Sequence, residues 1–123
     1  IKDIDASHCG LLPESQYPSM VAVQQARDSA MANSLPQPQL NELSVLIAGN
    51  YHARQDLGVP NYLLARGLNV DVDEIVSLAF MEVREGLLSA SEYVESTAGV
   101  NAYDYIWFTP AISNEDYCAA MVK

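Results

Sequence analysis

The spacing of hydrophobic residues predicts a chain that alternates between helices and strands. Residues 19–34 are rich in Ala, Met and Gln and contain neither Gly nor Pro, so they predict a continuous helix. Residues 43–48 form a short apolar run that ends at Gly49, which is typical of a strand buried on both faces of a parallel sheet. Because polar residues follow this run as far as Pro60, we expect residues 43–60 to organise the fold.

Two more strands are expected further along the chain. Residues 74–83 carry Ile, Val, Leu and Phe and follow a capped helix, which favours a strand over a helix. Residues 103–109 alternate and are aromatic, and Pro110 ends them.

Short helices are expected between these elements. Pro13 and Glu14 suit a helix start, and Pro18 is expected to restart that helix because a residue before proline avoids helical geometry. Pro60 and Gly67 bound a short helix at residues 61–66. The remaining expectations are a helical turn at 89–95, a short helix at 114–122, a stiff linker at 35–38 and a loop at 97–102.

This order of elements predicts an α/β fold with three or more parallel strands and flanking helices. Three strands make a thin sheet, so we expect them to be part of a larger sheet. We expect a single α/β domain or the C-terminal fragment of one, with a helical cap region at residues 1–35 and a sheet-forming core at residues 36–123.

Composition narrows the possible partners. Sixteen acidic residues oppose six basic ones, which argues against a nucleic-acid surface and against attraction to anionic lipid. No apolar run is long enough to span a bilayer, so direct membrane insertion is not expected. The spacing of Cys9 and Cys118 is not that of a zinc site. They form one disulfide or none, and we expect two ordinary thiols because disulfides are confined to oxidising compartments.

The strongest candidate site follows the apolar run at residues 43–48. Asn50, Tyr51, His52, Arg54 and Asp56 come directly after it, and ligands of open α/β sheets bind beyond the carboxyl ends of strands. For His52 the structural alternative is a histidine that bonds to loop backbone, and for Arg54 and Asp56 it is an ion pair within the loop.

The helix at residues 19–34 offers a second group of candidates. Met20, Gln24, Arg27 and Met31 follow at offsets of four, three and four, so they share one helix face. The plain interpretation is an amphipathic helix in which Met fills gaps. The functional one is a pocket wall, with Met packed on a flat apolar ligand and Arg27 paired with its carboxylate.

Three motifs stand out along the chain: His-Cys-Gly-Leu-Leu-Pro-Glu at residues 8–14, Gln-Gln-Ala-Arg-Asp-Ser-Ala-Met-Ala at 24–32 and the segment 45–60 with its Gly-Asn-Tyr-His and Gly-Val-Pro loop. Together and in this order they resemble the ChaN-like haem-binding family of the Tiki superfamily. The resemblance implies an α/β fold, a role in iron acquisition, and haem held by a tyrosine with a histidine nearby. The family's usual beginning is absent, so the chain looks like the C-terminal half of such a protein.

The resemblance also implies roles for particular residues. Tyr51 and Tyr17 are the candidate iron ligands, since an anionic oxygen suits Fe³⁺, and Tyr62 ranks third. The supporting set comprises His52 and His8 as neighbouring groups, Arg54 and Arg27 as propionate partners, Met20 and Met31 as packing for the porphyrin, and Gln24 as a further cofactor-binding residue.

We therefore expect a haem-binding protein of bacterial iron uptake that has no catalytic activity. Its full-length form is expected in the periplasm or anchored to the outer membrane, with a homodimer or a missing N-terminal half completing it. The alternatives are a metal-dependent hydrolase of the same superfamily and a non-catalytic interaction module.

Overall fold

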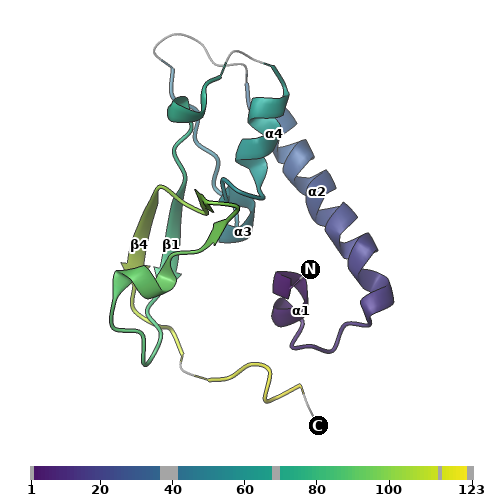
Figure 1. Cartoon of the computed structure of the whole chain (residues 1–123), viewed down its shortest axis with the longest axis vertical. Coiled ribbons are helices and arrows are strands. Elements are labelled where there is room, and N and C mark those ends of the chain that lie inside the picture. Colours follow the sequence, from purple (N-terminus) through teal and green to yellow (C-terminus); the bar gives the residue numbers. More distant parts are fainter. Residues whose placement is uncertain (1, 37–41, 68–69, 114, 122–123) are drawn as a thin grey trace.

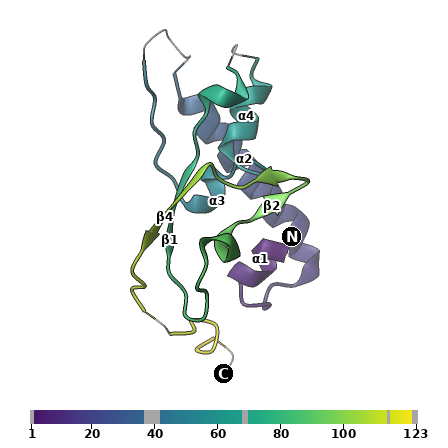
Figure 2. The same cartoon turned by 60° about the vertical axis from the view of Figure 1, so that its left-hand side comes forward.

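The computed structural model describes residues 2–36, 42–67, 70–113 and 115–121. Figure 1 shows the long helix α2 along one side, the strands β1 and β4 on the other, and the short helices α3 and α4 between them; Figure 2 shows the same arrangement from a second side. The helices are α1 (Lys2–Ser7), η1 (Glu14–Gln16), α2 (Tyr17–Ser34), α3 (Asn50–Ala53), α4 (Val59–Ala65), η2 (Val72–Glu74) and η3 (Ala90–Tyr93). The strands are β1 (Leu78–Glu82), β2 (Ser96–Thr97), β3 (Val100–Asn101) and β4 (Tyr105–Thr109).

The predicted long helix is confirmed as α2, and the short helix after Pro60 is confirmed as α4. A helix does restart near Pro18, because η1 ends at Gln16 and α2 begins at Tyr17 with Pro18 in its first turn. The expected non-helical geometry of Tyr17 is wrong, since its φ and ψ are −55° and −45°. Pro18 fits there because the first turn of a helix does not use its backbone N–H groups. Gly67 follows α4 with a φ of +65°, a conformation that glycine adopts without strain.

Two of the three predicted parallel strands are confirmed. β1 and β4 pair in parallel, in register from Leu78 opposite Tyr105 to Glu82 opposite Thr109. η3 lies between them in the chain, as predicted. The expected loop at residues 97–102 instead contributes to a small antiparallel pair, β2 with β3. The fold is α/β, but with two parallel strands rather than three.

The predicted strand at residues 43–48 is wrong. These residues have no regular secondary structure, and Leu43 and Ile47 are 89% and 93% exposed. A strand exists only when a neighbour supplies hydrogen bonds, and within the described residues no backbone hydrogen bond joins 43–48 to another segment. The apolar pattern of residues 43–48 is typical of a buried strand, but no sheet or helix of the described chain covers these residues.

The expected helix at residues 114–122 is also wrong where the structure describes it. Residues 117–121 form turns, in which the Asp116 carboxylate accepts the backbone N–H of Cys118 at 2.9 Å. The expected linker at 35–38 lies partly outside the described residues.

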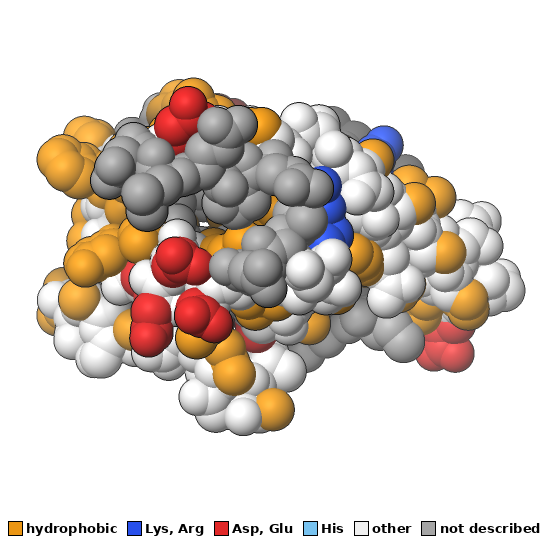
Figure 3. Space-filling model, turned by 90° about the horizontal axis from the view of Figure 1, so that it is seen from above, with side chains coloured by type: hydrophobic (Ala, Val, Ile, Leu, Met, Phe, Trp, Pro, Cys, Tyr) orange, Lys and Arg blue, Asp and Glu red, His pale blue; other side chains and the backbone are white. Residues whose placement is uncertain are grey.

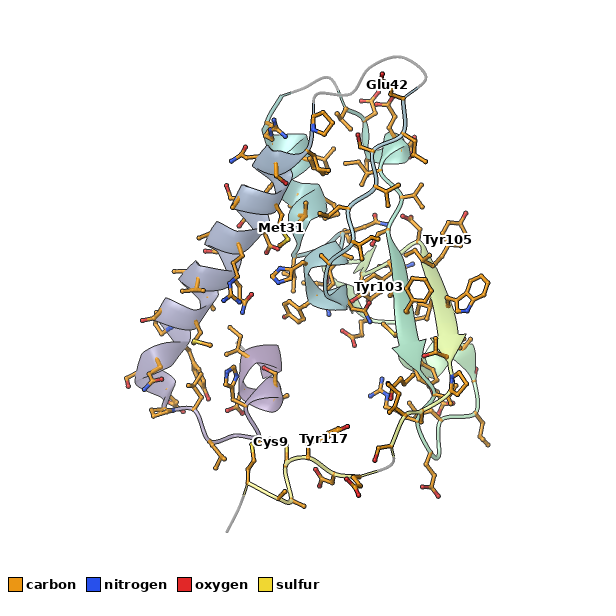
Figure 4. The ribbon with its side chains drawn as sticks, turned by 180° about the vertical axis from the view of Figure 1, so that it is seen from behind. Cys9, Met31, Glu42, Tyr103, Tyr105 and Tyr117 are labelled. Atoms are coloured by element: carbon orange, nitrogen blue, oxygen red, sulfur yellow. A yellow bond between two sulfur atoms is a disulfide. The ribbon has the colours of Figure 1, made fainter. Side chains whose placement is uncertain are left out.

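The two cysteines form a disulfide, so the expectation of ordinary thiols is wrong. Cys9 and Cys118 are bonded across a sequence separation of 109 residues. Figure 4 shows the C-terminal segment meeting the turn after α1 at this bond. The cross-link matters because the buried apolar residues of the described chain are few and mostly small: Ala32, Val59, Ala79, Tyr93 and Ala102.

Removal of the disulfide is expected to destabilise the protein strongly. Closing a loop of this length removes entropy from the unfolded chain worth about 5 kcal/mol. The double variant Cys9→Ser/Cys118→Ser should therefore unfold at a lower urea concentration, and a reducing agent should shift the wild type to the same midpoint. Equal midpoints for the variant and the oxidised wild type would contradict the bond.

Candidate functional site

His52 is held by a buried carboxylate on another helix. Its Nδ1 lies 2.6 Å from Oδ1 of Asp28, which is 5% exposed in the middle of α2. His52 belongs to α3, so this contact fixes the short helix to the long one. A carboxylate that accepts the proton of one ring nitrogen also sets the orientation of the imidazole. Asp28 was not expected to be a site residue, although its place one turn from Gln24 and from Met31 signalled that it shares their face.

The loop after α3 folds back tightly. The N–H of Gly58 donates to the carbonyl of Arg54 at 2.8 Å. A Cβ on Gly58 would collide with the backbone carbonyl of His52, so no larger residue fits without moving the chain. Gly58 therefore allows residues 52–58 to close on themselves and places Pro60 at the start of α4.

Arg54 is the centre of a buried ion-pair network. It is 4% exposed, and its Nε and Nη2 donate to the two carboxylate oxygens of Asp56 at 2.9 and 2.7 Å. Its Nη1 donates to Glu95, which precedes β2. Arg54 and Asp56 thus form an ion pair within the loop, which is the structural alternative to a ligand-binding role for these two residues. The guanidinium therefore already has two carboxylate partners within the chain.

The charged groups of this network stabilise each other's ionised forms. Hydrogen bonding to Asp56 raises the pKa of Arg54, and this effect outweighs the opposing effect of burial. Burial by itself raises the pKa of Asp56, but hydrogen bonds from Arg54 and Thr97, together with the charge of Arg54, outweigh it and lower that pKa. The pair is consequently ionised at neutral pH.

Tyr51 lies at the surface beside this network. It is 38% exposed, and Cζ of Arg54 lies 5.4 Å from its ring centroid. Cation–π contacts of this kind hold a ring in place. Two hydrogen bonds fix α3 from the other side: Nδ2 of Asn50 donates to the Phe80 carbonyl of β1 at 2.6 Å, and the Tyr103 hydroxyl donates to the Asn50 carbonyl at 3.0 Å.

Tyr17 and His8 belong to a separate region near the start of α2. The Tyr17 hydroxyl donates to Asp5 at 2.7 Å, and this hydrogen bond is the largest cause of a raised pKa for Tyr17. Nδ1 of His8 lies 2.7 Å from the Ile4 carbonyl, in a local contact at the end of α1. Asp28 lies eleven positions after Tyr17 in α2, which is about 16 Å along the helix axis. The structure therefore does not bring Tyr17 and His8 to Tyr51 and His52.

The four residues expected on one face of α2 differ in their burial. Met20, Gln24 and Met31 are half-buried, whereas Arg27 is exposed. The buried stripe of the helix runs through Asp28 and Ala32. Tyr62, the third-ranked tyrosine, is half-buried on α4.

Two hollows of the described chain lie beside the loop that follows α3 and beside η2. One of about 280 Å³ is lined by Asp56, Pro60, Leu64 and Ile75 among others, and one of about 410 Å³ by Gln55, Val72, Asp73, Ile75, Val76, Asp104 and Tyr105. Neither is lined by Tyr51 or His52. No group of three or more His, Cys, Asp or Glu side chains suited to a metal ion is found among the described residues. None of the helices in that part of the chain has the length and hydropathy needed to span a bilayer.

The arrangement is that of an α/β protein with a tyrosine and a carboxylate-oriented histidine on one short, rigid helix. The model of the family described as "Haem-binding uptake, Tiki superfamily, ChaN" matches residues 1–63. The chain belongs to this family, as the resemblance in its sequence indicated. Neither a search of curated proteins nor a search of solved structures finds a match.

Replacement of Arg54 is expected to unfold the site. In Arg54→Met the carboxylate of Asp56 stays buried without its partner, which costs about 3–5 kcal/mol at neutral pH. The matched variant Arg27→Met removes an exposed arginine and should change the stability by less than about 0.5 kcal/mol. Urea unfolding of both variants would measure the difference.

The cost in Arg54→Met is expected to fall in acid. Asp56 has a folded pKa below its ordinary value of 3.8, so the pair contributes fully above that pH and less as the pH falls through the lower folded value. Urea unfolding measured from pH 7 downward should thus show that the difference in free energy of unfolding between the wild type and Arg54→Met becomes smaller. An advantage that does not change with pH would contradict the role of Asp56.

Proposed function

We propose that this chain binds ferric haem for bacterial iron uptake, with Tyr51 as the iron ligand. The observation that carries the proposal is the fixed, surface-facing position of Tyr51 on α3, beside a histidine that Asp28 orients. Membership of a haem-binding uptake family supports it. Haem brings four ligands to its iron, so one protein side chain is enough to attach it, and tyrosinate oxygen suits Fe³⁺.

Residues of this chain fit the other needs of a porphyrin. Met31 and Gln24 lie one turn from Asp28 on α2, and Met20 lies one turn further, so a half-buried row leads away from His52. Polarizable methionine packs well on a flat aromatic ligand. Arg27 is exposed on the same helix and suits a propionate, whereas Arg54 is already bound to Asp56 and Glu95.

His52 takes a supporting role in this proposal. The contact with Asp28 occupies Nδ1 and leaves the position of the ring defined by α2. The imidazole then stands beside Tyr51 in sequence, where it is suited to hydrogen-bond a bound ligand. When bound, the haem would supply the iron centre, and the chain would supply the attachment and the orientation.

The disulfide supports the proposed location. Disulfides persist in oxidising compartments such as the periplasm and the outside of the cell. The bond between Cys9 and Cys118 thus favours a periplasmic or outer-membrane-anchored protein. Because Tyr51 lies at the surface, we propose that a second subunit or a further segment of the full-length protein covers the haem.

A haemin titration with matched tyrosine variants tests the proposal. Tyr51→Phe keeps the ring beneath Arg54 but removes the oxygen, so it should weaken haem binding about tenfold or more, ~1.4 kcal/mol, and abolish the tyrosinate absorption bands. Tyr17→Phe is the control and should bind as the wild type does.

Two outcomes would contradict the proposal. Tyr51→Phe with an unchanged spectrum would exclude Tyr51 as the ligand, and loss of the bands in Tyr17→Phe would move the site to the start of α2. Absence of saturable binding in the wild type and in a longer form with an N-terminal extension would exclude haem binding by these residues.

A further inference from the structure

One face of the parallel sheet is apolar and open. Leu78 and Phe80 of β1 point to the same side as Tyr105 and Trp107 of β4, which lie opposite them in register. Phe80 and Trp107 are 58% and 63% exposed although their ring centroids are only 6.4 Å apart. Figure 4 shows Tyr105 pointing away from the molecule, whereas Tyr103 points inward. Val76 extends the face beyond the start of β1. We call these five residues the open sheet face.

The opposite side of the sheet is partly covered by the chain itself, although Phe108 on that side is still 37% exposed. Ala79 is fully buried, and Phe108 makes an edge-to-face contact with Tyr93 of η3 at 4.9 Å. Parallel sheets normally have both faces covered, usually by helices. Contiguous exposed aromatic and aliphatic side chains of this kind mark an interaction surface.

Acidic side chains border the open sheet face, and no cation of the described chain neutralises them. Glu82 lies on the same face of β1, Asp104 precedes Tyr105, and Glu74 lies just before Val76. Their carboxylates accept only backbone N–H groups in the hydrogen bonds of the described residues, from Ile112, Ser77 and Asp71. The salt bridges of the described chain use other acids, namely Asp28, Asp56 and Glu95. Figure 3 shows acidic and hydrophobic side chains mixed at the upper end of the molecule.

A hollow at the end of the open sheet face combines both properties. The hollow of about 410 Å³ is lined by Val76 and Tyr105 of the face and by the acidic residues Asp73 and Asp104. Lysine and arginine have an apolar stem and a cationic head, so this combination fits one such side chain. Arginine that fills a pocket at the border of an apolar patch is a frequent anchor of protein interfaces.

We propose that the open sheet face binds an amphipathic helix of a partner polypeptide, with basic residues flanking its apolar stripe and one of them inserted between Asp73 and Asp104. A helix is the element that covers a parallel sheet. A second copy of this chain fits less well, because it would bring sixteen acids against six bases to a border that is already acidic. The proposal does not depend on haem binding.

Trp107 provides the test, because it is the only tryptophan of the chain and lies within the open sheet face. Two synthetic amphipathic peptides with the same leucine stripe, one flanked by Lys and one by Glu, serve as probes. The Lys peptide should shift the emission of Trp107 to shorter wavelength in a saturable manner, and added salt should weaken its binding. The Glu peptide should bind at least about tenfold more weakly.

Matched variants locate the binding. Phe80→Ser should weaken the Lys peptide about tenfold or more, whereas Leu88→Ser, which changes an apolar side chain with 96% exposure outside the face, should not. Asp73→Asn/Asp104→Asn should weaken it similarly, and Glu85→Gln/Glu115→Gln is the control with the same change in net charge. Circular dichroism verifies the fold of each variant.

Three results would overturn the proposal. Equal losses in the two double variants would show general attraction to an acidic protein rather than a site. Equal binding of the Lys and Glu peptides, or no binding of either, would remove the basic helix as the occupant. A shift of Trp107 emission with protein concentration alone, together with dimers in sedimentation, would identify a second copy as the occupant instead.

Discussion

The buried guanidinium of Arg54 is the point at which three segments of the chain are tied together. It binds Asp56 within its own loop and Glu95 at the start of the β2–β3 hairpin, and its charge lies over the ring of Tyr51. Backbone hydrogen bonds run in parallel, from Gln55 to the Ala102 carbonyl and from Ala102 to the Glu95 carbonyl, both at 2.8 Å. A fully bonded buried charge permits only one arrangement of its partners, so the loop that carries Tyr51 and His52 has little freedom.

This constraint has unusual weight because the apolar core is small. Three of the five buried apolar residues are alanines, and many large hydrophobic side chains remain at the surface. Burial of apolar area, the usual source of stability, is therefore limited in the described chain. Polar contacts and the disulfide therefore supply part of the stability that a larger apolar core supplies in other proteins. Tyr51 and His52 owe their positions to Arg54, Asp28 and Asn50 rather than to close packing.

The sequence predicts well those elements whose cause is local. The composition of residues 19–34 and the Pro60 and Gly67 boundaries are enough to locate α2 and α4, because helix hydrogen bonds and caps form between near neighbours. The family, too, is evident from motifs whose residues stand close in the chain. The parallel pairing of β1 and β4 is predicted correctly, since η3 and the hairpin provide the long connection that such a pair requires.

Errors arise where the outcome depends on distant residues. The strand expected at 43–48 requires a neighbour that the described chain does not place beside it, and no local pattern reveals this. The Cys9–Cys118 bond joins residues near both ends of the chain, so spacing alone does not decide it. Similarly, the base Arg27 and the acid Asp28 are neighbours in one helix, yet Arg27 is exposed and Asp28 is buried against His52.

The run at residues 43–48 and the open sheet face share one property, which is that both expose apolar side chains. Both carry side chains that a parallel α/β sheet normally buries, and both lie in a chain whose net charge of −10 opposes self-association. Charge of one sign keeps such surfaces apart from copies of themselves while it attracts a basic partner. The same acidic excess that argues against nucleic acid therefore also limits which protein surface is able to complete this sheet.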